Sequence, residues 1–193
     1  SPKFFRGKKP LHYLFNMRHD LWSTPVWRIE GAPQVLVDEL YQGAYRFKES
    51  YPSEKKTNQG GYQSPSFEWE AFQPQGIEYV EGVVSKIIED VESPYYENFK
   101  VQQWWYNING KGCWNTPHTH PNSDLALVLY LTDSDGLLSL LNPHAQRQFN
   151  RQHATINAKK GDIVIFPSDL MHYVMPNQRD TDRISISMNL QLC

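Results

Sequence analysis

Hydrophobic positions in the first half of the chain repeat with the period of an α-helix. From Val80 onward, the segment 77–92 places valine or isoleucine at i, i+3, i+4, i+7, i+8 and i+11, which makes one stripe along a helix. The segment 33–49 has a similar spacing behind Pro33, a residue suited to a first helical turn. We therefore predict two amphipathic helices, and we expect the one at 77–92 to pack on a flat surface. The segment between them, 51–76, is rich in Pro, Gly, Ser and Gln and predicts a loop.

After Pro94 the pattern becomes that of β-strands. Short segments rich in β-branched and aromatic residues are separated by turn residues, at 99–109, 125–132, 137–141, 161–167, 171–176 and 183–192. Helices followed by a run of strands are typical of an α+β fold. We predict a mainly β jelly-roll barrel supported by N-terminal helices. The length favours a single domain over 1–193, with 1–97 as an irregular and helical support segment and 98–193 as the barrel core.

The segment 183–192 separates two kinds of side chain. Its even positions are hydrophobic, whereas its odd positions are polar and begin with Arg183 and Ser185. Side chains alternate between the faces of a strand, so we expect the even face to lie in the hydrophobic core. If the odd face lines a barrel, its charge requires a ligand, because a buried charge is costly unless it is paired.

Composition narrows the range of functions. Nineteen basic and 21 acidic residues leave a formal net charge of −2, and no basic run indicates a nucleic-acid partner. No apolar run approaches the ~20 residues that span a bilayer. Two cysteines make no disulfide framework, which favours a reducing, cytoplasmic location. The sequence leaves the oligomeric state open, a homodimer included.

The stretch "NTPHTHPNSD" at 115–124 contains the clearest candidate chemistry. His118 and His120 are two residues apart, so on an extended segment both imidazoles face one side and can reach one metal ion. His172 opens a later predicted strand, and together the three predict a non-haem Fe(II) site with open positions for a cosubstrate and O₂. The residues alone leave the third ligand open between His120 and Asp124.

A second group fits a 2-oxoacid cosubstrate. Arg183 follows His172 after a turn, and an arginine can bind a carboxylate through two charge-assisted hydrogen bonds. Ser185 lies on the same strand face, and Tyr130 lies on the strand after the histidine pair. Both can donate a further hydrogen bond to that carboxylate.

These stretches resemble a family of 2-oxoglutarate–Fe(II) oxygenases, the hydroxylases found in bacteria and marine phages. The resemblance rests on "WYNINGKGCWNTPHTHPNSDLALVLYL", "GDIVIFPSDLMHYVMPN" and "DRISISMNL", with "WSTPVW" and "TNQGGYQS" earlier in the chain. It implies a double-stranded β-helix, with Fe(II), 2-oxoglutarate and O₂ as cofactor and cosubstrates, and hydroxylation with release of succinate and CO₂. By position it carries the metal to His118, His120 and His172, and 2-oxoglutarate to Arg183 and Ser185, with Tyr130 and Asn107 at polar barrel positions nearby.

The chain departs from the wider superfamily at the histidine pair. That superfamily usually has His-x-Asp/Glu, whereas this chain has His118-x-His120, so either His120 replaces the carboxylate or Asp124 supplies it. The substrate is unidentified, with a small molecule or a peptidyl side chain both open. If Asn107 faces the barrel interior, so do Trp105 and Gln103, which could line the substrate pocket. Gln63, in the predicted loop, could reach over the barrel mouth.

The alternative interpretation is a cupin-like metal- or sugar-binding module. The spacing from Gly112 through the histidine pair to Asp124 is similar to the first cupin motif, in which Asp124 would be an acidic ligand. That motif's downstream glycine is replaced by Leu131, however, and the cupin interpretation gives Arg183 no role. A barrel that has lost activity and only binds partners is a third possibility.

Overall fold

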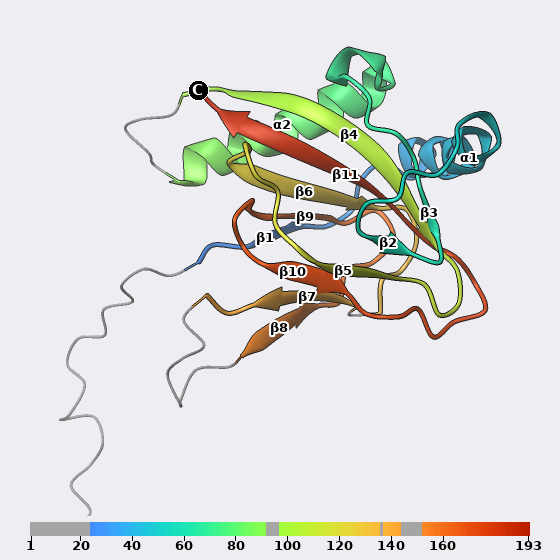
Figure 1. The fold of residues 1–193 in the computed structure, drawn as a ribbon. Helices are drawn as coiled ribbons and strands as arrows, with labels where there is room; N and C mark the ends of the chain where they lie inside the picture. The colour runs from blue at the N-terminus through green and yellow to red at the C-terminus, as the bar shows by residue number, and fades with distance from the viewer. Residues whose placement is uncertain (1–23, 92–96, 136, 144–151) are drawn as a thin grey trace, which may run out of the picture.

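The computed structural model describes residues 24–91, 97–135, 137–143 and 152–193. Two antiparallel β-sheets lie face to face, and two helices cover the outer face of the larger sheet (Figure 1). The predicted mainly β fold with supporting helices is therefore confirmed. The first 23 residues, which the sequence assigns to the support segment, lie outside the described part of the chain.

The strands are arranged as follows. The larger sheet has the order β1 (Trp27–Ile29), β9 (Ile163–Pro167), β6 (Leu125–Tyr130), β11 (Arg183–Leu192), β4 (Phe99–Asn109) and β3 (Tyr62–Gln63). The smaller sheet has the order β2 (Asn58–Gln59), β5 (Trp114–His118), β10 (His172–Val174), β7 (Leu138–Leu141) and β8 (His153–Ile156). The helices are α1 (Gln34–Ser50), α2 (Pro74–Val91) and the short 3-10 helix η2 (Trp69–Ala71).

The larger sheet has a different core on each of its faces. On the outer face, hydrophobic side chains of α1 and α2 pack against alternate residues of the central strands, such as Leu127 of β6 and Ile165 of β9. On the inner face, Ala126 and Phe166 pack against Leu140 of β7 in the smaller sheet. The predicted packing of the 77–92 helix on a flat surface is confirmed.

The polar and hydrophobic faces of β11 are those expected from the sequence. Ile184, Ile186 and Met188 are fully buried beneath the helices. Arg183 and Ser185 face the space between the two sheets. One strand therefore contributes both to the helix–sheet core and to the interior pocket.

The outer face of β4 packs on α1 and on the segment before α2. Tyr106 Oη donates a hydrogen bond to the Leu40 carbonyl oxygen of α1 at 3.1 Å. The Trp104 ring lies edge-on to Phe72, with 4.8 Å between centroids. The twist of the sheet brings this end of β4 under α1, which a strand pattern alone does not indicate.

Five strands are not predicted by the sequence pattern. The strands β1, β2 and β3 have two or three residues each, which is too short to show a period of two. The strand β8 has four residues and is mostly exposed, and β5 contains a proline at residue 117. Among the described residues, neither long helix is apolar enough to cross a membrane.

Candidate metal and cosubstrate site

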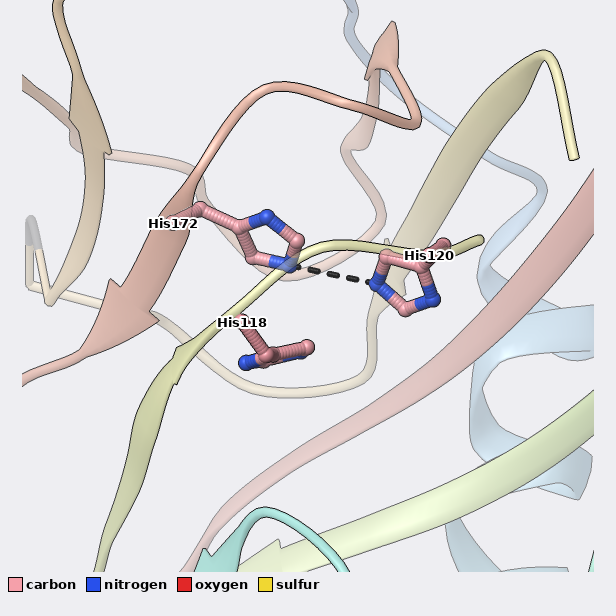
Figure 2. Close-up of side chains that lie close together, drawn as sticks. All are labelled: His118, His120 and His172. Atoms are coloured by element: carbon pink, nitrogen blue, oxygen red, sulfur yellow. Dashed lines mark hydrogen bonds between the residues drawn. The ribbon is translucent and has the colours of Figure 1, made fainter. Parts of the chain in front are cut away.

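Three histidines converge in the space between the sheets (Figure 2). His118 ends β5 and His172 begins β10, and the antiparallel pairing of these strands places the two residues opposite each other. His120 follows two residues after β5, where its backbone N–H donates to the Ser168 carbonyl oxygen at 2.8 Å. The potential ligand atoms of the three histidines all lie within 4.8 Å of one another.

Backbone carbonyl groups fix the orientation of two of these rings. His118 Nδ1 lies 2.7 Å from the Thr116 carbonyl oxygen, and His172 Nδ1 lies 2.8 Å from that of Leu170. Because a carbonyl oxygen can only accept, each Nδ1 must carry the proton, and each Nε2 is free to bind a metal. His120 Nε2 lies 3.2 Å from His172 Nε2, so it faces the same point.

Burial keeps the histidine cluster uncharged. Loss of hydration, together with the nearby His118 charge, lowers the pKa of His172 to about 3 and that of His120 to about 4. Burial also lowers the pKa of His118. Near neutral pH all three rings are therefore neutral, which is the form that binds a metal ion.

The donor set fits a borderline divalent cation. Three imidazole nitrogens suit Fe, Zn, Cu or Ni better than Mg or Ca, which prefer oxygen ligands. No carboxylate belongs to the cluster among the described residues. A divalent ion held there would therefore keep its full charge, which would alter its redox behaviour relative to a site with a carboxylate ligand.

The Asp124 side chain is used elsewhere. Its Oδ2 accepts a hydrogen bond from the Leu192 backbone N–H at 2.8 Å, and the residue is exposed. Its backbone N–H donates to the Leu190 carbonyl oxygen. Asp124 thus binds the end of β11 through hydrogen bonds and does not belong to the histidine cluster. The cupin-like interpretation, which needs Asp124 as an acidic ligand, gains no support from this arrangement.

Arg183 and Tyr130 are two buried polar residues that lie against each other in the interior of the protein. Arg183 is only 4% exposed, and its guanidinium carbon lies 5.3 Å from the centre of the fully buried Tyr130 ring. Neither Arg183 Nε nor Tyr130 Oη makes a hydrogen bond of regular geometry, and no carboxylate pairs with Arg183 in the described part of the chain. The guanidinium does act on the Tyr130 phenol, whose pKa it lowers against the larger effect of burial. A buried guanidinium without an anionic partner is costly, and a bound anion would remove this cost.

The sheet register aligns the polar residues beside this pair. Ser185 of β11 is the partner of Tyr130 on one side and of Asn107 on the other. Asn107 Nδ2 donates to Ser187 Oγ at 3.1 Å, whereas its Oδ1 has no partner. The pocket is lined by residues of both sheets, among them the three histidines, Arg183, Ser185, Asn107 and Trp105.

The predicted substrate residues lie in different surroundings. Trp105 lines the pocket, with its ring centroid 5.7 Å from that of His120. Gln103 is half-buried on the same strand and is not among the residues that line the pocket. Gln63 is not in a loop over the barrel mouth, because it is buried in β3 as the register partner of Asn107.

Two further neighbours of the site have no role assigned from the sequence. Asn189 of β11 is buried, its Oδ1 has no hydrogen-bond partner of regular geometry, and its amide opposes the lowering of the His120 pKa. The alternation of β11 could have identified Asn189, because it shares the polar face with Arg183. Thr57, from the segment before β2, lines the pocket and carries no recognisable signal in the sequence.

Comparison with known proteins agrees with the resemblance described above. Residues 103–189 match the model of a family described as "Putative 2OG-Fe(II) oxygenase". Comparison with curated proteins finds no match.

Similar solved structures span nearly the whole chain. A prolyl-4-hydroxylase from Pseudomonas putida has a TM-score of 0.65 at 14% identity, over 88% of this chain and 93% of the other. HygX from Streptomyces hygroscopicus, with nickel and 2-oxoglutarate bound, has a TM-score of 0.64 at 12% identity, over 93% and 85%. The viral collagen prolyl hydroxylase of Paramecium Bursaria Chlorella virus-1 has a TM-score of 0.57 at 15% identity, over 86% and 94%.

Proposed function

We propose that this chain, which its family match and fold indicate to be an Fe(II)- and 2-oxoglutarate-dependent oxygenase, holds iron through His118, His120 and His172. We further propose that Arg183 binds the cosubstrate. The observation that carries the proposal is that the buried Arg183 has no anionic partner in the described part of the chain and lines one pocket with the three histidines. When bound, the iron supplies O₂ activation coupled to decarboxylation of 2-oxoglutarate to succinate and CO₂.

The residues of the chain have separate tasks in this proposal. Arg183 pairs with the carboxylate of 2-oxoglutarate that is farther from the metal, through two charge-assisted hydrogen bonds. Tyr130 Oη, which makes no hydrogen bond of regular geometry, and Ser185 Oγ each donate one more. The hydrophobic residues between the sheets exclude water from this interior, which strengthens the pairing of the carboxylate with Arg183.

The substrate is proposed to enter beside Trp105 and Asn107 and to be hydroxylated there. The similar solved structures include enzymes named for prolyl residues and HygX with hygromycin B bound, which supports either a peptidyl or a small-molecule substrate. The nearly balanced charge of the chain supports neither a nucleic acid nor an anionic membrane as partner. The cytoplasmic location stays a prediction from the sequence.

The test of the proposal uses the purified protein without oxygen. Fe(II) and 2-oxoglutarate added together are expected to give a weak visible charge-transfer band and to raise the melting temperature. Arg183→Ala is expected to lose the band at the same cosubstrate concentration, whereas Arg179→Ala, which removes an exposed arginine paired with Asp135, should keep it. If the unsubstituted protein gives neither the band nor the stabilisation, the proposal is wrong.

A further inference from the structure

The three histidines differ in the hydrogen-bond partner of Nδ1, the ring nitrogen that is not directed to the centre of the cluster. His118 and His172 each donate through Nδ1 to a backbone carbonyl oxygen two residues earlier in the chain. His120 has no such carbonyl partner among the residues with described positions, and the hydrogen bond of its ring joins Nε2 to His172. The orientation of the third ring must therefore depend on something other than the backbone.

Asn189 is the side chain placed to act on this ring. It is 6% exposed and lies on the polar face of β11, two residues beyond Ser187. Ser187 is the register partner of Trp105, whose ring contacts that of His120. Ala126, the register partner of Asn189 on β6, lines the same pocket as His120, and the buried Asn189 Oδ1 has no hydrogen-bond partner of regular geometry. The Asn189 amide also raises the pKa of His120 against the effect of burial. A buried amide oxygen without such a bond is free to accept one.

The chemistry of a metal-bound imidazole requires an acceptor at this position. A histidine that binds a metal through Nε2 is neutral and carries its proton on Nδ1. That N–H is usually given to a carboxylate, a carbonyl or a water molecule, which fixes the ring and increases its basicity. An asparagine oxygen satisfies this N–H without adding a negative charge to the site.

We propose that Asn189 is the positioning residue for His120, and that its amide oxygen accepts the Nδ1 proton so that Nε2 is directed to the metal. The inference rests on the proposed function, because it assumes that the three histidines bind a metal ion. In this proposal a side chain orients the His120 ring, whereas backbone carbonyl groups orient the rings of His118 and His172.

The experiment measures Co(II) affinity and the visible Co(II) spectrum of the full chain at pH 7.5. Asn189→Leu, which has nearly the same shape but no acceptor, is expected to bind Co(II) about 10- to 100-fold more weakly. Asn189→Asp restores an acceptor and is expected to bind at least as tightly as the unsubstituted protein, with a shifted spectrum. Gln191→Leu makes the same kind of change at an exposed position of β11 and should leave the affinity unchanged.

The outcomes separate the inference from the proposed function. Asn189→Leu binding within twofold of the unsubstituted protein, or Asn189→Asp losing as much affinity as Asn189→Leu, overturns the inference and leaves the proposed function in place. If Asn189→Leu does not fold, Asn189→Asp decides alone, and weaker binding by this variant overturns the inference. If the unsubstituted protein binds no Co(II), or if His172→Ala binds it equally well, the proposed metal site is wrong and the inference fails with it.

Discussion

The guanidinium carbon of Arg183 lies 5.3 Å from the centre of the Tyr130 ring, and neither Arg183 Nε nor Tyr130 Oη makes a hydrogen bond of regular geometry in the described structure. The two groups are donors at neutral pH, because burial raises the pKa of Tyr130 and keeps its phenol protonated. Two buried donors this close together are stabilised by an acceptor that both can reach. A carboxylate has the charge and the lone pairs to accept from both.

Tyr130→Phe is expected to weaken 2-oxoglutarate binding by about tenfold, since one hydrogen bond to a charged group contributes about 1.5 kcal/mol. The measurement is calorimetric titration of 2-oxoglutarate into the Co(II)-loaded protein. Tyr79→Phe, which removes a phenol oxygen from the half-buried Tyr79 of α2, is the matched control and should not change the affinity. An affinity of Tyr130→Phe within twofold of the unsubstituted protein would remove this tyrosine from the cosubstrate site.

The question of the third metal ligand is decided by two substitutions. His120→Ala removes one of three ligands and is expected to weaken Co(II) binding by about 100-fold or more. Asp124→Ala is expected to keep the affinity within about threefold, because the Asp124 carboxylate bonds to the Leu192 N–H. Its effect should instead be a loss of about 1 kcal/mol in the free energy of unfolding. The reverse order of metal affinities would show that Asp124 is the ligand.

The contact of α1 with β4 predicts opposite effects for two glycine-to-alanine substitutions. A Cβ at Gly43 would lie 2.7 Å from Tyr106 Oη, which donates to the Leu40 carbonyl oxygen. Gly43→Ala should therefore lower the free energy of unfolding by about 1–3 kcal/mol. At Gly82 of α2, no atom lies within 4 Å of the position that a Cβ would take, so Gly82→Ala should raise the stability by about 0.5–1 kcal/mol through helix propensity.

Urea denaturation of the metal-free protein measures both glycine effects. The two substitutions add the same methyl group within a helix, so a difference in sign reports the surroundings and not the residue type. Equal stabilisation by both substitutions would mean that Tyr106 does not pack as closely on α1 as the structure has it.

Periodic segments were predictable from the sequence, and segments without a period were not. The strand at 183–192 has the predicted bounds because its alternation extends over ten residues, and the helix at 77–92 has a continuous hydrophobic stripe. The strands β2 and β3 form because β4 and β5 offer free edges to pair with. Such pairing depends on tertiary contacts, which leave no pattern in a two-residue segment.

The candidate site also has features that the sequence predicts and features that it does not. The spacing of His118 and His120 and the alternation of β11 allowed the histidines and Arg183 to be proposed together, and the fold brings them to one pocket. The sequence could not tell which polar residue of β11 faces which histidine. The choice depends on how the segment after β5 passes from the smaller sheet to β6 of the larger sheet. In the folded chain it is Asn189 whose amide raises the pKa of His120 against the effect of burial. For the same reason, the sequence keeps Asp124 as a candidate ligand, whereas its bond to Leu192 directs the carboxylate elsewhere.

The carbonyl partners of His118 and His172 have a consequence for how this site tolerates sequence change. Every amino acid has a backbone carbonyl group, so replacement of Thr116 or Leu170 does not delete the acceptor that orients either ring. Two of the three rings are thus protected against point mutation of their partners. If Asn189 positions His120 as proposed, it is the one ring-orienting partner whose side chain a point mutation can change. Natural variation or laboratory evolution could then adjust the metal affinity at this residue.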